Sequence, residues 1–339
     1  DTKADKWLAE FKGSKADTPA KAAESADFVF TCVGNDEDLN EVTIGENGIY
    51  KTIKKGSIYI DNTTASANIA RKLAKSAEAH GFSFLDAPVS GGQAGAENGA
   101  LTVMIGGSKI AFERAKPIID CYSKKVKLLG PSGNGQLAKM VNQICIAGLV
   151  QGLSEAINFG VKSGLNMEDV IEVISKGAAQ SWQMENRYKT MLDDKFEHGF
   201  AVDWMRKDLK IAMEEAKNNG SLLPVTEIVD KYYSEVQKMG GNRWDTSSLI
   251  RRLSKYSSMQ PSYYEDFTGI KNKIWSMLDN AIKDRGSPFR IPVFICGNQD
   301  DFDGRIVVLR KSDQSNNLIQ YHSDIRSNKI AKLKSNKNA

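Results

Sequence analysis

A single long helix, predicted to start at Gly133 and Gly135, is the feature that most constrains this sequence. Two glycines make a tight entry, and apolar residues at helical spacing follow them. These positions are Leu137, Met140, Val141, Ile144, Ala147, Val150, Leu153 and Ile157. Between 144 and 150 the segment is apolar nearly all round, which is typical of a buried central helix. We therefore expect the rest of the chain to pack around it.

The first two turns of this helix carry Lys139, Asn142 and Gln143, which spacings of three and four place on one face. A lysine near a helix N-terminus meets the positive end of the macrodipole, which is unfavourable for a purely structural cation. Such a lysine loses its proton more readily, as suits an acid/base catalyst. On this segment alone, a solvated lysine on an exposed turn is the simpler interpretation, because most lysines lie at the surface.

Composition narrows the class of protein. A length of 339 residues favours two or three domains. The net charge of +4 is too mild to indicate nucleic acid or a membrane as partner. No apolar run of about 18 residues and no signal peptide is recognised. We therefore expect a cytoplasmic protein.

The cysteines and histidines do not predict a metal site. The three histidines form no HExxH-type pair, and the four cysteines form no CxxC. We expect reduced, mostly buried thiols at Cys32, Cys121, Cys145 and Cys296.

Residues 1–132 alternate strand-like and helix-like segments, which predicts an α/β domain with a largely parallel sheet. The predicted strands are 28–33, 57–61, 82–86 and 101–105, with an amphipathic helix over 66–80. Three strand ends, 34–36, 61–64 and 86–92, are polar, and two of them contain glycine. Ligands bind beyond the carboxyl ends of such strands, so these ends predict the rim of a cleft.

A Rossmann fingerprint is not found in this sequence. No GxGxxG occurs, and Gly91 to Gly95 lack the strand–loop–helix setting that the motif requires. We expect any phosphate-binding loop to lie upstream of Asp1, in a longer polypeptide, and hence expect this chain to bind cofactor poorly.

Residues 133–253 predict helices throughout: 167–176, 181–192, 202–220 and 225–239 follow the long helix. By itself, Lys207-Asp208 is typical of surface charge. Trp182, Trp204 and Phe200 are expected in the core rather than as cofactor-stacking groups.

The character of the chain changes after a predicted linker at 254–265. A helix is expected over 269–284, followed by three strands at 291–296, 305–310 and 318–322. Three strands make a poor closed sheet, so 266–339 is expected to be a partial domain.

Four motifs in order give the first 253 residues a resemblance to the β-hydroxyacid dehydrogenase family. They are Asp86-Ala87-Pro88-Val89-Ser90-Gly91-Gly92, Gly133-Asn134-Gly135 followed by Lys139 and Asn142, Gly199-Phe200, and Lys207-Asp208-Leu209. The resemblance implies a Rossmann-type NAD(P) domain over 1–132 and an all-α domain over 133–253 that completes the active site and dimerises. It also favours a catalytic Lys139 over a solvated one.

The same resemblance implies the roles of single residues. Lys139 would give a proton to the carbonyl oxygen of a small substrate during reduction and remove it during oxidation. Ser90, Gly91 and Gly92 would bind the substrate carboxylate, Asn142 would hold the substrate, and Phe200 and Asp208 would line or order the closed site. NAD or NADP would contact Val33, Gly34, Thr64 and Lys207. Many members carry a second asparagine after the first, whereas here Asn142 precedes Gln143, which leaves the substrate open.

The last segment resembles the first half of a pyridoxamine 5′-phosphate oxidase-like, FMN-binding split barrel. The matching residues are Arg305, Arg310, His322, Ser323 and Lys329, which the resemblance assigns to FMN. An ordinary basic β-hairpin is the alternative. Two further functions stay open for the whole chain: a flavoprotein oxidase, and a dinucleotide-binding scaffold without chemistry.

Overall fold

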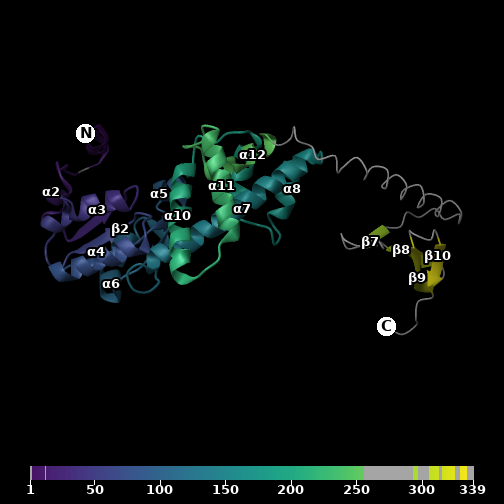
Figure 1. Cartoon of the computed structure of the whole chain (residues 1–339), viewed down its shortest axis with the longest axis horizontal. Helices are drawn as coiled ribbons and strands as arrows, with labels where there is room; N and C mark the ends of the chain where they lie inside the picture. The colour runs from purple at the N-terminus through teal and green to yellow at the C-terminus, as the bar shows by residue number, and fades with distance from the viewer. Residues whose placement is uncertain are drawn as a thin grey trace. The chain divides into compact units, whose positions relative to one another are not determined.

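The computed structural model describes residues 2–11, 13–255, 293–296, 305–312, 315–324 and 329–333. The chain divides into two compact units, Asp1–Met259 and Gln260–Ala339. The first unit begins with an α/β part and continues into helices (Figure 1).

Two three-stranded sheets form the α/β part. Its strands are β1 (Phe28–Thr31), β2 (Ile58–Asp61), β3 (Ser83–Asp86), β4 (Val89–Ser90), β5 (Leu101–Ile105) and β6 (Ser123–Leu128). The order β1-β2-β3 is parallel throughout, whereas in β4-β5-β6 the short β4 is antiparallel to β5 and β6 is parallel to it. The predicted α/β class with a largely parallel sheet is confirmed, and β4 and β6 are strands that the sequence reasoning missed.

Helices cover both faces of the β1-β2-β3 sheet. The helices of the α/β part are α1 (Thr2–Glu10), α2 (Pro19–Ala23), α3 (Asp36–Ile44), η1 (Ile49–Lys51), α4 (Ala67–His80), α5 (Gly92–Glu97) and α6 (Lys109–Ile119). Among them, α3 and α4 lie on one face of this sheet and α6 on the other. Tyr59 and Phe84 pack with α3 and α4 in one core cluster, while Ile58, Ile60 and Leu85 pack with β5 and α6 in another. Successive side chains of β2 therefore point alternately into two core clusters, and all residues of this strand are buried.

Helix α7 (Asn134–Lys162) is the predicted long helix, and it organises the helical part. Around it lie α8 (Met167–Ile174), α9 (Trp182–Leu192), α10 (Val202–Asn219), α11 (Pro224–Lys238), η2 (Thr246–Leu249) and α12 (Ile250–Lys255). Ala147 and Val150 pack with α10 and α11, whereas Leu153 and Ile157 pack with α8 and α9. The four later helices predicted from the sequence are confirmed within two residues at each end.

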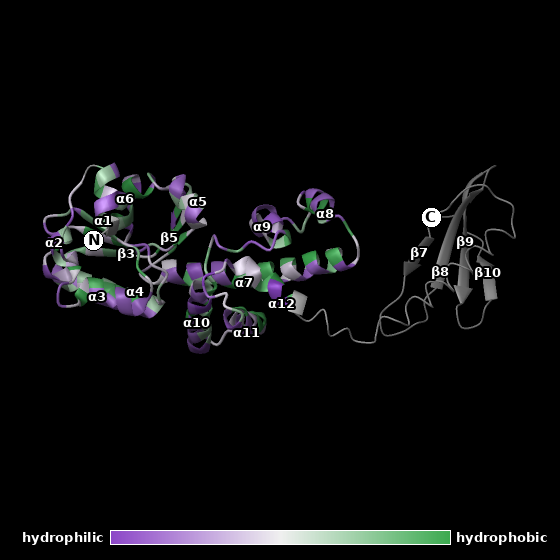
Figure 2. Cartoon of the chain, turned by 90° about the horizontal axis from the view of Figure 1, so that it is seen from above, coloured by the Kyte–Doolittle hydropathy of each residue, from purple (hydrophilic) through white to green (hydrophobic). Residues whose placement is uncertain are grey.

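Helix α7 is apolar over much of its length (Figure 2). Among the described residues, it is the helix that is long and apolar enough to cross a membrane, and buried helices of soluble proteins pass the same test. The contacts of α7 with α9 to α12 and with β5 are those of a central packing helix. The predicted cytoplasmic location stays a prediction.

Two predictions of burial are wrong. Trp182 and Trp204 expose 49% and 37% of their surface, so neither indole is a core group. Cys32, Cys121 and Cys145 are free, as expected, but exposed rather than buried.

The second unit contains an antiparallel sheet of order β10-β9-β8-β7. Its strands are β7 (Val293–Cys296), β8 (Arg305–Ser312), β9 (Ser315–Asp324) and β10 (Lys329–Leu333). The three predicted strands are confirmed, and β10 is an additional one. Arg305 and Arg310 lie on β8, His322 and Ser323 on β9 and Lys329 on β10, and their assignment to FMN stays a prediction. The predicted helix at 269–284 lies outside the described residues, as does the predicted linker beyond Lys255, where α12 ends.

Candidate active site

The carboxyl ends of the three parallel strands meet at one edge of their sheet. The register pairs Thr31 with Asp61 and Asp61 with Asp86. The polar segments that follow these strands therefore start side by side, as the sequence predicted.

Asp61 is completely buried at this edge and orders two of the strand ends. Its Oδ1 accepts hydrogen bonds from Thr31 Oγ1 at 2.8 Å and from Thr63 N at 3.1 Å. Thr63 Oγ1 in turn accepts from Val33 N at 2.9 Å. Burial raises the pKa of Asp61 to about 7, although the hydrogen bonds from Thr63 and Thr31 oppose that shift.

Asp86 caps the start of α7 from the end of β3. Its carboxylate accepts from Gly133 N at 2.8 Å and Gln136 N at 3.1 Å, where a negative charge also meets the positive end of the helix. Gly133 needs the left-handed region, with φ +96°. A Cβ on Gly135 would lie 2.5 Å from the Met104 carbonyl oxygen, so this position requires glycine for close approach.

Lys139 lies one turn after this cap with only 6% of its surface exposed. Its Nζ donates to the carbonyl oxygen of Val89 at 2.8 Å, directly before Ser90. Burial lowers the pKa of Lys139, Lys207 lowers it further, and Asp208 raises it. The predicted direction of the shift is confirmed with burial as its main cause, and the interpretation as a solvated lysine is wrong.

Lys207 bonds α10 to the loops after β1 and β2, and Asp208 bonds it to α7. Lys207 Nζ donates to the carbonyl oxygens of Gly34, at 3.0 Å, and of Thr64. It also lies 3.2 Å from Oδ1 of Asp208, which is completely buried. Asp208 Oδ2 accepts from Gln143 Nε2 at 2.6 Å. Interpreting this pair as surface charge is therefore wrong.

Asn142 belongs to the same hydrogen-bonded group as Gln143 and Asp208, because its Nδ2 donates to Gln143 Oε1 at 2.8 Å. The longer side chain at 143 thus bridges Asn142 to Asp208.

Ser90 is the last residue of β4, and Gly91 and Gly92 follow it with φ of +140° and +63°. Both glycines are exposed, which leaves their backbone accessible.

Phe200 is held by a different carboxylate. Its backbone N–H donates to Asp245 Oδ2 at 2.9 Å, while its ring packs on the cluster between α7, α10 and α11. A Cβ on Gly199 would lie 2.0 Å from the same Asp245 oxygen, so this glycine lets the loop approach.

Four buried polar residues that order this region were not predicted to do so: Asp61, Asp86, Gln136 and Asp245. Three of them stand next to features that the sequence does show, namely a polar strand end or a required glycine. Their burial, however, depends on tertiary packing.

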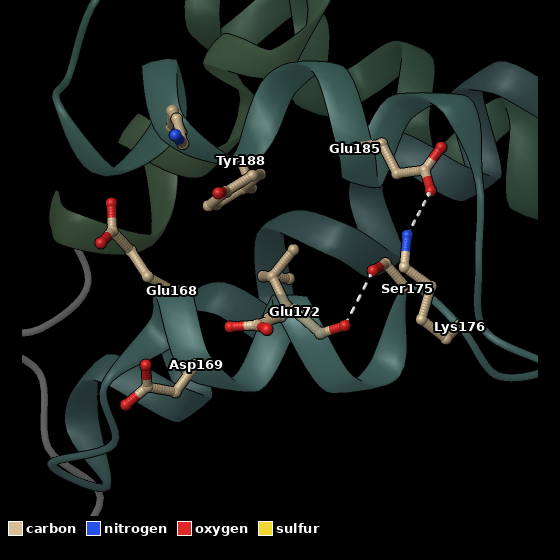
Figure 3. Close-up of a pocket in the computed structure, with 9 residues that line it drawn as sticks. Glu168, Asp169, Glu172, Ser175, Lys176, Glu185 and Tyr188 are labelled. Carbon is tan, nitrogen blue, oxygen red and sulfur yellow. Dashed lines mark hydrogen bonds and ion pairs between the residues drawn. The ribbon is translucent and has the colours of Figure 1, made fainter.

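A cavity of about 350 Å³ lies elsewhere, between α8 and α9 (Figure 3). Glu168, Asp169, Glu172 and Glu185 contribute to its lining, and Lys176 lies 3.7 Å from Glu185. None of the predicted site residues lines it. Within the part of the chain that the structure describes, no three His, Cys, Asp or Glu side chains group as metal ligands.

Two family models match the first unit. Residues 1–130 match the NAD binding domain of 6-phosphogluconate dehydrogenase. Residues 133–253 match the NAD-binding domain of NADP-dependent 3-hydroxyisobutyrate dehydrogenase.

Individual relatives agree with these models. An uncharacterized oxidoreductase of Shewanella frigidimarina is 61% identical over 256 residues, which are 76% of this chain and 88% of the relative. The 2-hydroxy-3-oxopropionate reductase of Escherichia coli is 33% identical over 70% of this chain and 81% of its own length. The crystal structure of a 3-hydroxyisobutyrate dehydrogenase from Salmonella typhimurium is similar with a TM-score of 0.66, at 28% identity over 73% of this chain and 86% of that one. With its Rossmann-type part followed by helices, the chain therefore belongs to the NAD(P)-dependent β-hydroxyacid dehydrogenase family, of which 3-hydroxyisobutyrate dehydrogenase is a member.

Proposed function

We propose that the chain interconverts a short β-hydroxy acid and the corresponding semialdehyde acid with NAD or NADP, with Lys139 as the general acid/base. The observation that carries this proposal is a buried lysine of lowered pKa beside the Val89–Ser90 backbone and the Asp208–Lys207 pair. A proton donor of this kind needs an enclosed site and a pKa closer to neutrality.

The residues of the strand edge fit a nicotinamide dinucleotide. The carboxyl ends of β1 and β2 are the expected place for it, and Lys207 bridges the two loops there through the carbonyls of Gly34 and Thr64. A Cβ on Gly34 would lie 2.6 Å from the Asp38 carboxylate and 3.3 Å from the Trp204 ring, so a larger residue would have to displace these side chains. Val33, Gly34, Thr64 and Lys207 would hold the cofactor, which supplies or accepts the hydride when bound.

Lys139 would act on the oxygen of the substrate. During reduction its ammonium stabilises the negative charge that develops on the carbonyl oxygen and then transfers a proton to it. During oxidation the neutral amine takes the hydroxyl proton, and the ammonium returns that proton to solvent. Ser90, with the exposed backbone N–H groups of Gly91 and Gly92, would fix the substrate carboxylate, and Asn142 and Asp208 would order the side towards α10.

The names of the relatives support this substrate class. One relative, from Eubacterium barkeri, is named 2-(hydroxymethyl)glutarate dehydrogenase and is 34% identical over 68% of this chain. Mouse 3-hydroxyisobutyrate dehydrogenase is 31% identical over 70% of it. The choice between NAD and NADP, and among these acids, is left to experiment.

Reductase turnover of the full chain tests the proposal. Because this chain is expected to bind cofactor poorly, the oxidation of NADH and NADPH is followed at saturating cofactor, with glyoxylate and a panel of short semialdehydes, beside direct titration of each cofactor. We expect turnover with at least one pair and its loss in Lys139→Ala. Cofactor binding without any turnover would favour the dinucleotide-binding scaffold. Micromolar binding would contradict the separate prediction that this chain binds cofactor poorly.

We also propose that the chain forms a homo-oligomer through an exposed apolar surface on α7 and α11. This surface consists of Val141 and Leu149 on α7, Leu222 just before α11, and Val225 and Ile228 in the first turns of α11, exposed by 46% to 89%. A Cβ on Gly148 would lie 4.0 Å from Val225, which makes the two helices neighbours at this surface. Light scattering after size exclusion should show a mass above one chain that falls in Val225→Glu and not in the control Val173→Glu on α8. A monomeric parent protein would contradict it.

We propose separately that this chain binds little flavin, and that FMN would be held by Arg305, Arg310, His322, Ser323 and Lys329, in this order along three strands, only in a protein that carries the rest of the domain. A flavin spectrum of the protein after incubation with FMN and desalting tests it. A protein that stays yellow after desalting would contradict it.

A further inference from the structure

Gln136 is buried to 1% exposure, and both atoms of its side-chain amide bond to one backbone loop. Its Oε1 accepts from Ala65 N at 3.0 Å, and its Nε2 donates to the Thr63 carbonyl oxygen at 2.8 Å. One amide thus pairs with the donor and acceptor that flank Thr64, which fixes both the position and the orientation of that loop.

The same residue is tied to a second strand end. Its backbone N–H donates to Asp86 Oδ2 at 3.1 Å, and Thr63 is itself bonded to Val33 N through its hydroxyl. Gln136 therefore connects the start of α7 with the ends of β1, β2 and β3. Lys139 stands three residues further along this helix.

We infer that Gln136 is a positioning residue that couples the helix bearing Lys139 to the loop bearing Thr64. It keeps the proton donor and the cofactor contact in fixed relation, so that both meet one substrate. The coupling is a property of the fold, while its effect on turnover rests on the proposed function. A displacement of about 1 Å between reacting groups can cost on the order of 100-fold in rate.

Gln136→Met removes both hydrogen bonds with nearly unchanged side-chain length. Gln151→Met is the matched control, because Gln151 is also buried on α7, at 7% exposure, but donates within the helix to Glu155 at 2.6 Å. Both variants lose a buried amide from one helix, and only the first loses a link to the cofactor loop.

Hydrogen exchange in the ligand-free full chain tests the coupling directly. We expect the amides of peptide 62–67 to exchange about tenfold faster in Gln136→Met, as for a loop that opens locally, and to be unchanged in Gln151→Met. Equal exchange in both variants overturns the inference, whatever the activity of the protein.

Kinetics then test its consequence. We expect kcat to fall by about 10- to 100-fold in Gln136→Met and by less than about twofold in Gln151→Met, at matched melting temperatures. Equal kcat in the two variants of an active enzyme overturns the role in turnover. A parent protein that binds no cofactor and turns over no substrate sinks the proposed function instead, and the exchange result still decides the coupling.

A pH series separates positioning from general stability. In Gln136→Glu the ionised carboxylate can accept from Ala65 N but cannot donate to the Thr63 carbonyl, and protonation restores that donor. We expect kcat relative to the parent enzyme to rise as the pH falls. A ratio that stays flat with pH counts against the inference.

Discussion

The two halves of α7 bury different kinds of side chain. Gln136, Lys139 and Gln143 are buried in the first three turns, and each bonds to another element: the loop after β2, the segment before Ser90, and α10. The second half buries apolar residues such as Ile157, and its buried polar residues bond within the helix, as Ser154 does with the Val150 carbonyl.

The difference shows where the helix carries function and where it carries stability. A buried polar group costs free energy unless it is paired, so a fold under selection for stability alone would place apolar residues in both halves. The first half instead holds a lysine of lowered pKa in a network that spans four elements. Substitutions in the two halves should therefore separate activity from stability.

Lys139→Met is the largest expected effect on activity. Loss of a positioned general acid typically costs 10²- to 10⁴-fold, so we expect kcat to fall by about 10³-fold. The free energy of unfolding should not fall, because a buried cation is replaced by an apolar side chain of similar length. Steady-state reductase rates and urea unfolding measure both. Lys162→Met, at the exposed end of the same helix, should change neither.

Ile157→Ala should have the opposite signature. Ile157 is 1% exposed in the cluster with α8 and α9, so its truncation leaves a cavity. We expect a loss of about 3 kcal/mol in the free energy of unfolding, with kcat per folded molecule within about twofold of the parent. Urea unfolding and active-site titration measure these. A large fall in kcat at 25 °C would show that the second half of α7 also shapes the active site.

The sequence predicted the apolar half of α7 better than the polar half. Helical spacing of Ala147, Val150, Leu153 and Ile157 indicated burial directly, and all four are buried. Val141, on the same pattern, and Leu149, within the apolar segment 144–150, are exposed by 63% and 46%, so the expectation of a helix buried all round is wrong there. Burial of Lys139 contradicts the usual behaviour of its residue type, so only the resemblance of the surrounding motif pointed to it. Gln136 follows the required glycine at 135, but nothing in the sequence indicated its burial or its bonds, because its partners lie about 70 residues away along the chain.

The carboxyl ends of β1, β2 and β3 show the same limit of prediction from the sequence. Their polar character was visible in the sequence, since three apolar runs each stop at a polar segment. The strand register and the burial of Asp61 were not visible there. The register places Asp61 between Thr31 and Asp86, and burial raises its pKa. Trp204 was misjudged because an aromatic residue within a helical pattern usually faces the core, whereas here it faces the surface beside Gly34.

Asp61→Asn tests whether burial of a polar group at the strand edge costs stability. The pKa of Asp61 is raised to about 7 in the folded chain, from 3.8. The folded state therefore holds a proton that the unfolded state has lost between these pH values, and stability falls as the pH rises from 4 to 7. The full shift corresponds to about 4 kcal/mol.

We expect Asp61→Asn to be more stable than the parent by about 2 kcal/mol at pH 8, less than the full shift because the amide adds a buried donor. The advantage should vanish towards pH 4. Urea unfolding of both proteins between pH 4 and 8 measures it. A difference that is constant with pH would mean that Asp61 is ionised throughout.

Asp208→Asn should give the smallest of these effects on activity, and its clearest sign should be a shift in the pH dependence of the rate. Asp208 raises the pKa of Lys139, so its neutralisation lets Lys139 lose its proton at lower pH. Reduction needs the ammonium, so the alkaline limb of the rate profile should move to lower pH. Loss of one charged partner should also lower kcat/KM by roughly tenfold, about 1.4 kcal/mol. Asp203→Asn, one turn earlier on α10 and bonded to Gln237, is the control and should leave the profile in place. An alkaline limb that stays fixed in Asp208→Asn would assign that limb to a group other than Lys139. The contrast between the two halves of α7 would then no longer rest on a functional lysine of lowered pKa.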